Sequence, residues 1–279
     1  MNSNKLITII LVSYRSRNKV INFVKKIPKK YKIIIIDNSK DNYLKKKLKF
    51  INKNILVFLN KNEGYGSAIN FARTKIKTKY FLICNPDILI NNNNIITNFY
   101  KCAVKLNDKF LCIGPNYNSN NTEKKIRIIK VKKISGACMF INSKAFDSIG
   151  GFDENIFLYF EEDDLCKRGN KINFNSYKLI SQSVNHDIGT SVEVKTTKEK
   201  IKLKHLTLWH FIWSKYYFYK KNYGTIISLI LFLPTIIRIY FKLILNLVTK
   251  DEKNFQKYKS RCDGLLTSIK GGKSYKRIF

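Results

Sequence analysis

The chain has 279 residues, of which 53 are Lys or Arg and 19 are Asp or Glu, so its formal net charge at pH 7 is +34. Apolar residues make up 44% of the sequence, and it has only 12 Gly and 4 Pro. Such a chain can bury a sizeable core, which excludes a disordered or collagen-like protein. The length fits one large domain with an appendage, or two modest domains.

The excess of positive charge has two interpretations. Only 8 of the 53 basic residues are Arg, and Asn and Ile are also abundant, which is typical of a genome poor in G and C. A solvated lysine-rich surface therefore accounts for much of the charge. Attraction to phosphates or anionic lipid is about equally well supported.

The cysteines and the start of the chain indicate a cytoplasmic protein. None of the six cysteines forms a CxxC pair, and none lies near a His in the order typical of zinc ligands. Four of them fall in apolar or helical runs, where a buried, reduced thiol is usual. Residues 1–5 lead directly into a strand pattern without a separate apolar signal core.

Short apolar runs alternate with polar, helix-like stretches in the first half of the chain. Continuous β-branched runs of this length predict buried strands, and the stretches between them predict helices, the first at Lys19–Lys26. The predicted strands are Thr8–Tyr14, Lys32–Asp37, Ile55–Asn60, Tyr80–Cys84 and Phe110–Gly114. This order predicts a Rossmann-like α/β fold, with a mainly parallel sheet covered by helices on both faces.

The pattern changes twice after this half. Residues 115–133 are polar and predict a surface loop with an edge strand, and a strand at Ile134–Asn142 and a helix at Ser143–Ile149 follow. From about residue 195, lysines, aromatics and a long apolar stretch replace the alternation. We therefore expect an α/β domain over 1–194 and a helical module over 195–279.

Polar side chains close three of the predicted strands. Ser13 ends the first strand, Asp37 the second, and Asn85-Pro86-Asp87 follows the fourth. Ligands in open α/β sheets bind beyond the carboxyl ends of the strands. A lone Asp there more often caps a helix or turn. Two together favour a nucleotide, with Asp37 accepting hydrogen bonds from base or ribose and Asp87 holding a divalent cation.

The segment Asn60–Asn70 follows the third predicted strand. Gly64 and Gly66 precede a predicted helix there, which allows close backbone approach to an anion. A plain loop-to-helix turn explains the same residues about equally well.

The segment Gly150–Cys166, GGFDENIFLYFEEDDLC, places four acidic residues directly after an aromatic run. Because negative charges at such short spacing repel one another, they raise the pKa of a carboxyl group toward the range of a general base. The alternative is a solvated helix start, where acidic residues suit the helix dipole. His186 is a second candidate: a lone His is more often structural, but imidazole and the Asp87 carboxylate together suit Mn²⁺.

In this order, the motifs resemble family 2 glycosyltransferases over residues 6 to 190. They are SYRS, IIIIDNS, NEGYGSAIN, NPD, SGACMFI, the acidic segment and His186. The series is most similar to the rhamnosyltransferase-like branch, which builds bacterial surface polysaccharides. The resemblance implies a GT-A fold, a nucleotide-diphosphate sugar donor, Mg²⁺ or Mn²⁺, and inversion at the anomeric carbon.

The resemblance also implies a role for individual residues. Asn85-Pro86-Asp87 stands at the metal-binding DxD motif with Asn in first position, and Glu162 stands at the catalytic base, with Glu161 and Asp163 as alternatives. Asp87 and His186 would hold the metal. The implied nucleotide and donor contacts are Ser13, Asp37, Asn62, Gly64, Asn70 and Asn85. The nucleotide-binding half would cover about 1–114 and the acceptor-binding, catalytic half about 115–194.

The resemblance indicates the class of donor and acceptor but does not identify the particular substrates. Deoxythymidine-diphosphate rhamnose is the branch's expectation, and uridine-diphosphate hexoses are equally compatible with Asp37. The acceptor is expected to be a lipid-linked saccharide. Two further functions compete: a nucleotidyltransferase-type enzyme, for which Ser16-Arg17-Asn18-Lys19 offers basic residues but no glycine-rich loop, and a basic nucleic-acid-binding protein. No nucleic-acid-binding motif is present, so we expect no such partner.

The C-terminal module combines aromatic residues, lysines and an apolar stretch. Asn222–Ile237 has no charge but is broken by Pro234, and it falls short of a confident membrane span. Arg238, Lys242 and Asn246 then recur every fourth position, which predicts an amphipathic helix. A packed helical hairpin and a helix in the membrane interface both fit, with a spanning helix third. We favour the interfacial helix, on a protein peripheral to the inner face of the cytoplasmic membrane.

Overall fold

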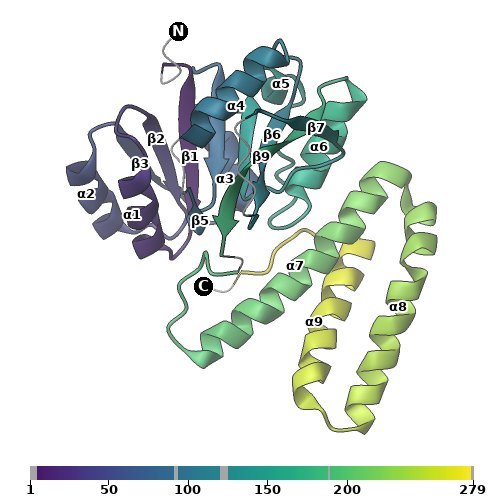
Figure 1. Cartoon of the computed structure of the whole chain (residues 1–279). Helices are drawn as coiled ribbons and strands as arrows, with labels where there is room; N and C mark the ends of the chain where they lie inside the picture. Colours follow the sequence, from purple (N-terminus) through teal and green to yellow (C-terminus); the bar gives the residue numbers. More distant parts are fainter. Residues whose placement is uncertain (1–4, 91–93, 120–124, 188, 278–279) are drawn as a thin grey trace. The chain divides into compact units, whose positions relative to one another are not determined.

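The structure is a computed structural model that describes residues 5–90, 94–119, 125–187 and 189–277. The chain divides into two compact units (Figure 1). The first consists of Met1–Asp153 and Glu162–Glu193, and the second of Glu154–Glu161 and Val194–Phe279. Two predictions fall partly outside the described residues. They are the start of the chain, expected to have no signal segment (residues 1–4), and the surface loop (residues 120–124).

The first unit is built on one mixed sheet. Among the described residues, nine strands pair in the order β3-β2-β1-β4-β8-β6-β9-β5, with β7 beside β9. The strands are β1 (Ile7–Ser13), β2 (Lys32–Asp37), β3 (Ile55–Leu59), β4 (Tyr80–Cys84), β5 (Ile88–Leu89), β6 (Cys112–Tyr117), β7 (Ile128–Val131), β8 (Cys138–Asn142) and β9 (Ser176–His186). Strands β1 to β4 run parallel, and β8 is antiparallel to both β4 and β6. The mainly parallel α/β fold expected from the sequence is confirmed.

Among the described residues, six helices belong wholly or largely to this unit, and the sheet lies between two apolar cores. They are α1 (Arg17–Lys26), α2 (Asn42–Ile51), α3 (Tyr65–Arg73), α4 (Asn94–Lys105), α5 (Ser143–Ser148) and α6 (Glu161–Lys171). Alternate residues of β2 face different cores: Ile33 and Ile35 join one cluster, and Ile34 and Ile36 join the other. A strand buried on both faces has to be apolar at every position, which is why its sequence is an unbroken apolar run.

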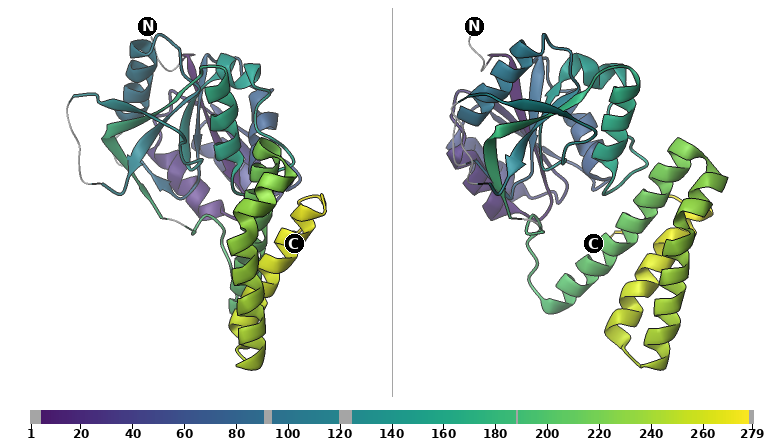
Figure 2. Two further views of the ribbon diagram at one scale, coloured as in Figure 1. Left: turned by 90° about the vertical axis from the view of Figure 1, so that its right-hand side faces the viewer. Right: turned by 45° about the vertical axis from the view of Figure 1, so that its right-hand side comes forward.

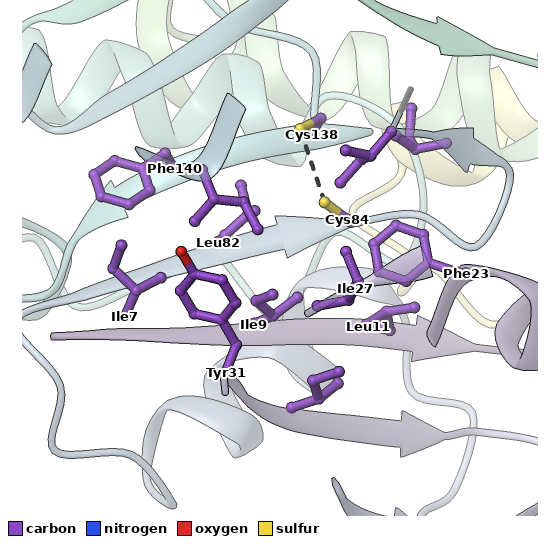
Figure 3. Packing of buried hydrophobic residues seen from close by; sticks show 14 of the residues in the cluster. Ile7, Ile9, Leu11, Phe23, Ile27, Tyr31, Leu82, Cys84, Cys138 and Phe140 are labelled. Atoms are coloured by element: carbon purple, nitrogen blue, oxygen red, sulfur yellow. Dashed lines mark hydrogen bonds between the residues drawn. The ribbon is translucent and has the colours of Figure 1, made fainter. Parts of the chain in front are cut away.

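Figure 3 shows the first of these cores, where side chains of β1, β4 and β8 meet those of α1. Cys84 and Cys138 face each other there with their sulfur atoms 3.8 Å apart. All six cysteines are free, and five are buried. The sequence prediction of buried, reduced thiols at positions 84, 112, 138 and 166 agrees with this.

The parallel strands bring their carboxyl ends to one edge of the sheet. Ser13 pairs with Asp37 across β1 and β2, and Leu11 pairs with Cys84 across β1 and β4. Strand β8 begins at Cys138, which pairs with Cys84, so the loop leading into β8 lies at the same edge. This edge carries most of the polar residues singled out by the sequence.

The second unit consists of three long helices and one short segment. Helices α7 (Thr197–Tyr223), α8 (Thr225–Val248) and α9 (Glu252–Ile269) pack together, with α9 against both others (Figures 1 and 2). The segment 154–161 joins them, although the sequence analysis assigned it to the α/β domain. The rings of Phe157 and His210 contact each other at a tilt, with centroids 4.6 Å apart, and Ser214 donates a 2.8 Å hydrogen bond to the Leu158 carbonyl. These contacts across the sequence attach the aromatic run to the helices.

Helix α8 differs from the expected break at Pro234. The helix runs through this proline and has 24 residues. A proline inside a helix removes one backbone hydrogen bond, but its fixed φ is compatible with helical geometry. Helix α8 is long and apolar enough to cross a membrane by length and composition.

Candidate active site

The site at the carboxyl edge of the sheet begins with Ser13 and Asp37, both fully buried. The Asp37 carboxylate accepts hydrogen bonds from the Ser39 hydroxyl at 2.7 Å and from the Asp41 backbone N–H at 2.5 Å. Asp37 therefore shapes the loop that follows β2. Its predicted contact with a nucleotide stays a prediction.

The residue after Asp37, Asn38, has a side-chain oxygen that is available to a ligand. Asn38 is buried, and its Oδ1 has no hydrogen-bond partner among the described residues. Its Nδ2 lies 3.5 Å from Oδ1 of the predicted donor-binding residue Asn62. Asn62 also hydrogen-bonds Tyr14, whose pKa is raised by burial. Three strand-end loops thus bring Tyr14, Asn38 and Asn62 together.

The glycine loop and helix α3 carry two further predicted donor-binding residues, Gly64 and Asn70. Gly64 precedes α3 with a φ of 116°, a value that favours glycine. Asn70 accepts a hydrogen bond from the Phe152 N–H and donates one to the Phe152 carbonyl, both at 2.9 Å. Asn70 holds the start of the acidic segment against α3, a role the sequence analysis missed.

The two predicted metal ligands lie side by side. Asp87 and His186 are 99 positions apart in the sequence, yet the short β5 pairs with β9 and brings Nε2 of His186 to 3.6 Å from Oδ1 of Asp87. Asp87 is buried, and its Oδ2 accepts a 2.5 Å hydrogen bond from the Ser191 hydroxyl. Asn85, which opens this loop, donates its backbone N–H to the Ala137 carbonyl at 2.8 Å.

This pair fits a divalent cation. Oδ1 of Asp87 is buried and accepts no hydrogen bond from any residue that the structure describes, which leaves a carboxylate oxygen available beside an imidazole nitrogen. Among the described residues, no group of three or more His, Cys, Asp or Glu residues is arranged to hold a metal. A two-ligand site suits Mg²⁺ or Mn²⁺, which take their remaining ligands from water and phosphate.

The chain after β9 closes over the loop between β1 and α1. Glu193 donates its backbone N–H to the Arg15 carbonyl at 2.7 Å and accepts from the Asn18 N–H at 3.0 Å. Lys19 hydrogen-bonds Thr190 and lies 3.6 Å from the Asp187 carboxylate. These contacts hold the strand ends of β1 and β9 together and leave the Lys19 ammonium occupied.

The four acidic residues of α6 divide by their partners. Asp163 forms a 2.7 Å ion pair with Lys133, and the fully buried Asp164 forms a 2.7 Å ion pair with Arg168. Arg168 also donates to the carbonyls of Ile149 and Gly151, so this pair fastens the glycine turn to α6. Glu161 is buried and belongs to the second unit.

Glu162 is the member of the cluster that faces a cavity. A pocket of about 310 Å³ is lined by Glu162 together with Pro115, Tyr117, Lys133, Ile134, Ser135 and Lys178. Oε1 of Glu162 accepts a 3.4 Å hydrogen bond from the Gly136 N–H. Burial raises the pKa of its carboxyl, the Asp163 charge adds to the rise, and the N–H groups and Lys133 oppose it.

The segment 135–137 joins the two halves of this edge. Gly136 contacts Glu162 on one side and accepts a 2.7 Å hydrogen bond from the Tyr65 hydroxyl, while Ala137 accepts from Asn85. Glu162 and the Asn85–Asp87 loop are therefore separated by one short stretch of backbone. In the sequence this segment is part of a predicted strand and of the motif SGACMFI, but its contacts with Glu162 and Asn85 left no signal there.

Some groups at this edge had no signal in the sequence. Ser191 reaches Asp87 across 104 positions, and Lys178 and Tyr117 line the pocket from strands β9 and β6. Only strand pairing brings them there. Asn38 had a signal, since it directly follows a strand-end Asp.

Comparison with known proteins places this edge in a family context. Residues 8–189 match the family model described as Glycosyl transferase family 2. The chain belongs to glycosyl transferase family 2. The match ends close to where the first unit ends, so the family assignment concerns that unit.

Two curated relatives are distant or cover little. The chain is 23% identical over 196 residues to the low-salt glycan biosynthesis hexosyltransferase Agl10 of Haloferax volcanii, which covers 61% of this chain and 63% of that protein. It therefore spans less than two thirds of that relative's length. It is 40% identical over 53 residues, 19% of this chain and 17% of the other, to N-acetylglucosaminyl-diphospho-decaprenol L-rhamnosyltransferase of Mycobacterium tuberculosis.

Solved structures support the GT-A fold. The mannosyltransferase PcManGT of Pyrobaculum calidifontis, in complex with GDP-Man and Mn²⁺, has a TM-score of 0.57 at 9% identity, covering 95% of this chain and 87% of the other. S. aureus TarS 1-349 in complex with UDP-GlcNAc has a TM-score of 0.52 at 13% identity, covering 97% and 93%. At these identities the likeness shows the fold alone.

Proposed function

We propose that this protein is an inverting glycosyltransferase that moves a sugar from a nucleotide-diphosphate donor to a hydroxyl group of its acceptor. The observation that carries the proposal is the arrangement at one sheet edge. The loop that carries Asp87 hydrogen-bonds the Ala137 carbonyl through Asn85, and Glu162, which lines the pocket, accepts a hydrogen bond from the neighbouring Gly136 N–H. A leaving-group site and a proton acceptor are thus available next to each other.

The donor is assigned to the strand-end loops. Asn38, Asn62 and Tyr14 offer polar groups for a base or ribose, and Ser13, Asp37, Gly64, Asn70 and Asn85 follow the family's donor contacts. Asp87 and His186 would hold Mg²⁺ or Mn²⁺, in keeping with the Mn²⁺ in the PcManGT complex. When bound, such a cation neutralises negative charge on a diphosphate leaving group as a Lewis acid.

Glu162 is assigned the role of general base. Its carboxylate takes the proton from the acceptor hydroxyl while that oxygen bonds to the anomeric carbon and the bond from this carbon to the diphosphate oxygen breaks. One displacement of this kind inverts the anomeric centre. The raised pKa of Glu162 suits proton abstraction near neutral pH, and Asp163 and Asp164 are already paired with Lys133 and Arg168.

We assign the acceptor site to the pocket beside Glu162, and we propose that the acceptor is a lipid-linked saccharide. The decaprenol-linked substrate named for the mycobacterial relative supports this class, as does the family branch that makes surface polysaccharides. Rhamnose is the corresponding donor sugar. A lipid-linked acceptor would also place the protein at the inner face of the cytoplasmic membrane.

The competing nucleotidyltransferase function needs free basic groups in the first βα turn to grip phosphates. Arg17 instead forms a two-bond ion pair with Asp41, at 2.6 and 2.8 Å, and Lys19 is engaged with Asp187 and Thr190. These pairs weigh against that function. The charge of +34 by itself is a weak sign of nucleic-acid binding, and we propose no such partner.

The test is release of nucleoside diphosphate from a panel of nucleotide sugars, with Mn²⁺ or Mg²⁺ and a lipid-linked saccharide. We expect transfer from one donor, and we expect Glu162→Gln to lower kcat by about 10²- to 10⁴-fold, the usual contribution of a general base, while donor-induced thermal stabilisation persists. Glu252→Gln, an exposed glutamate on α9, is the matched control and keeps full activity. Normal turnover by the Glu162 variant removes it from the base role.

A further inference from the structure

Helix α8 exposes a large apolar surface. Thirteen of its 24 residues are large apolar side chains that are exposed. Its most exposed members include Ile226 at 75%, Ile244 at 62% and Val248 at 74%. The buried residues of α8 form a narrow stripe, Ser228, Phe232, Ile239 and Asn246, and Ile236 and Leu243 pack beside it against the core of the second unit.

The exposed surface is wider than one partner helix covers. Ile226, Ile230, Leu233, Ile237 and Ile244 follow one line along the helix, as the seam of a helical dimer does. However, the positions beside that line are also apolar and exposed, among them Ile227, Leu231 and Leu247. At about 100° per residue, this surface covers about 200° of the circumference. A dimer seam is narrower than this, so a second copy does not account for the whole surface.

The charges around α8 match an anionic partner. From residue 200 to residue 250 the sequence has nine Lys and Arg residues and no Asp or Glu. On α8 itself, Arg238 and Lys242 lie at one margin of the apolar surface, next to the buried stripe. Apolar side chains bordered by basic ones are the pattern of a helix that lies in the interface of an anionic bilayer.

The neighbouring helix argues against a membrane-spanning α8. Helix α9 packs along α8 (Figure 1). A hydrogen bond between Tyr240 and Cys262 joins the two helices near their middles. At that level α9 carries Lys257, Lys259 and Arg261. If α8 crossed the bilayer, α9 would carry these charges into the hydrocarbon, where charged side chains are rare and costly.

We infer that α8 lies parallel to the plane of an anionic membrane, with its line of apolar residues Ile226, Ile230, Leu233, Ile237 and Ile244 sunk into a single leaflet. Lys257, Lys259 and Arg261 of α9 then stay on the headgroup side. The inference specifies how the membrane attachment in the proposed function is made. It does not depend on the transfer chemistry.

The first experiment is flotation of the full-length protein with phosphatidylcholine vesicles, with and without phosphatidylglycerol. We expect binding that increases with phosphatidylglycerol, and a roughly tenfold or greater loss of binding in Ile230→Gln/Ile244→Gln. The control Phe50→Gln/Val104→Gln changes two exposed apolar residues of the first unit and keeps binding. Equal binding by both variants, or self-association without vesicle binding, overturns the inference.

The second experiment separates lying in one leaflet from crossing the bilayer. Thr225→Cys and Thr249→Cys mark the two ends of α8, each in a Cys262→Ser background because Cys262 is the one native cysteine that is not buried among the described residues. A membrane-impermeant maleimide added outside sealed vesicles labels both ends if α8 lies in the outer leaflet. Protection of one end shows a spanning helix and overturns the inference.

The transfer chemistry is measured separately. Nucleoside diphosphate release from donor alone, without vesicles, reports the first unit, and we expect Ile230→Gln/Ile244→Gln to retain it. Vesicle binding without donor turnover would reject the proposed function and leave the membrane inference standing. Donor turnover without vesicle binding would do the reverse.

Discussion

The ion pair between Arg168 and Asp164 allows a quantitative test of how α6, the helix that carries Glu162, is held. Asp164 is 1% exposed, and Arg168 bonds its carboxylate at 2.7 Å and the carbonyls of Ile149 and Gly151 at 2.5 and 2.7 Å. Arg168→Met leaves a buried carboxylate without its partner. Breaking a buried pair on one side costs about 3–5 kcal/mol.

A matched control exists in the same unit. Arg17 also forms two bonds with one carboxylate, that of Asp41, but its side chain is 44% exposed. Exposed pairs contribute roughly 0–1 kcal/mol, so Arg17→Met is expected to change stability by less than about 1 kcal/mol. The double variant Arg168→Met/Asp164→Leu is expected to recover part of the loss, because it removes the stranded charge.

The assay has to report the first unit alone. Both tryptophans, Trp209 and Trp213, are in the second unit, so intrinsic tryptophan fluorescence does not follow the sheet. Amide hydrogen exchange in peptides from β1 and β4 does, and about 3–5 kcal/mol corresponds to roughly a hundred- to a few thousandfold faster exchange. Equal, small effects of Arg168→Met and Arg17→Met would refute the reasoning.

Three further outcomes follow from the contacts described above. Because burial raises the pKa of Glu162, its carboxylate form is lost at a higher pH than in an ordinary glutamate. We therefore expect kcat to begin to fall at a higher pH as the solution is acidified. A pH profile with the acidic limb of an unperturbed glutamate would contradict this. Asn70→Ala breaks both hydrogen bonds to the Phe152 backbone, costing about 1–3 kcal/mol, and should speed hydrogen exchange in the peptide around Phe152. In Gly264→Ala the new Cβ would lie 2.5 Å from the Trp209 carbonyl oxygen, so tryptophan fluorescence should show a second unit destabilised by about 1–3 kcal/mol, and an unchanged transition would disprove the tight α7–α9 contact.

The strands that are buried on both faces of the sheet were predictable from the sequence. The prediction for Lys32–Asp37 has the same bounds as β2, and Tyr80–Cys84 the same as β4, because strands buried on both faces are unbroken apolar runs. The helical module was harder. Pro234 predicted a break, yet it lies within a continuous α8 whose packing stripe avoids it.

The site was predictable in its residues more than in its contacts. The sequence singled out Asp87 and His186, but only the antiparallel pairing of β5 with β9 brings them together. The sequence also left Glu161, Glu162 and Asp163 as alternatives for the general base. Asp163 is paired with Lys133, which lies thirty positions away, so the sequence does not show which of these acids is engaged. Partners distant in sequence leave no periodic pattern.

The most direct test of the account is a crystal structure with Mn²⁺ and a nucleoside diphosphate, with the metal located by its anomalous scattering. The account predicts Mn²⁺ bound by Asp87 and His186, with the diphosphate beside it and Glu162 facing the space next to the terminal phosphate. Mn²⁺ held by other residues, or a diphosphate bound away from the cavity that Glu162 lines, would contradict it.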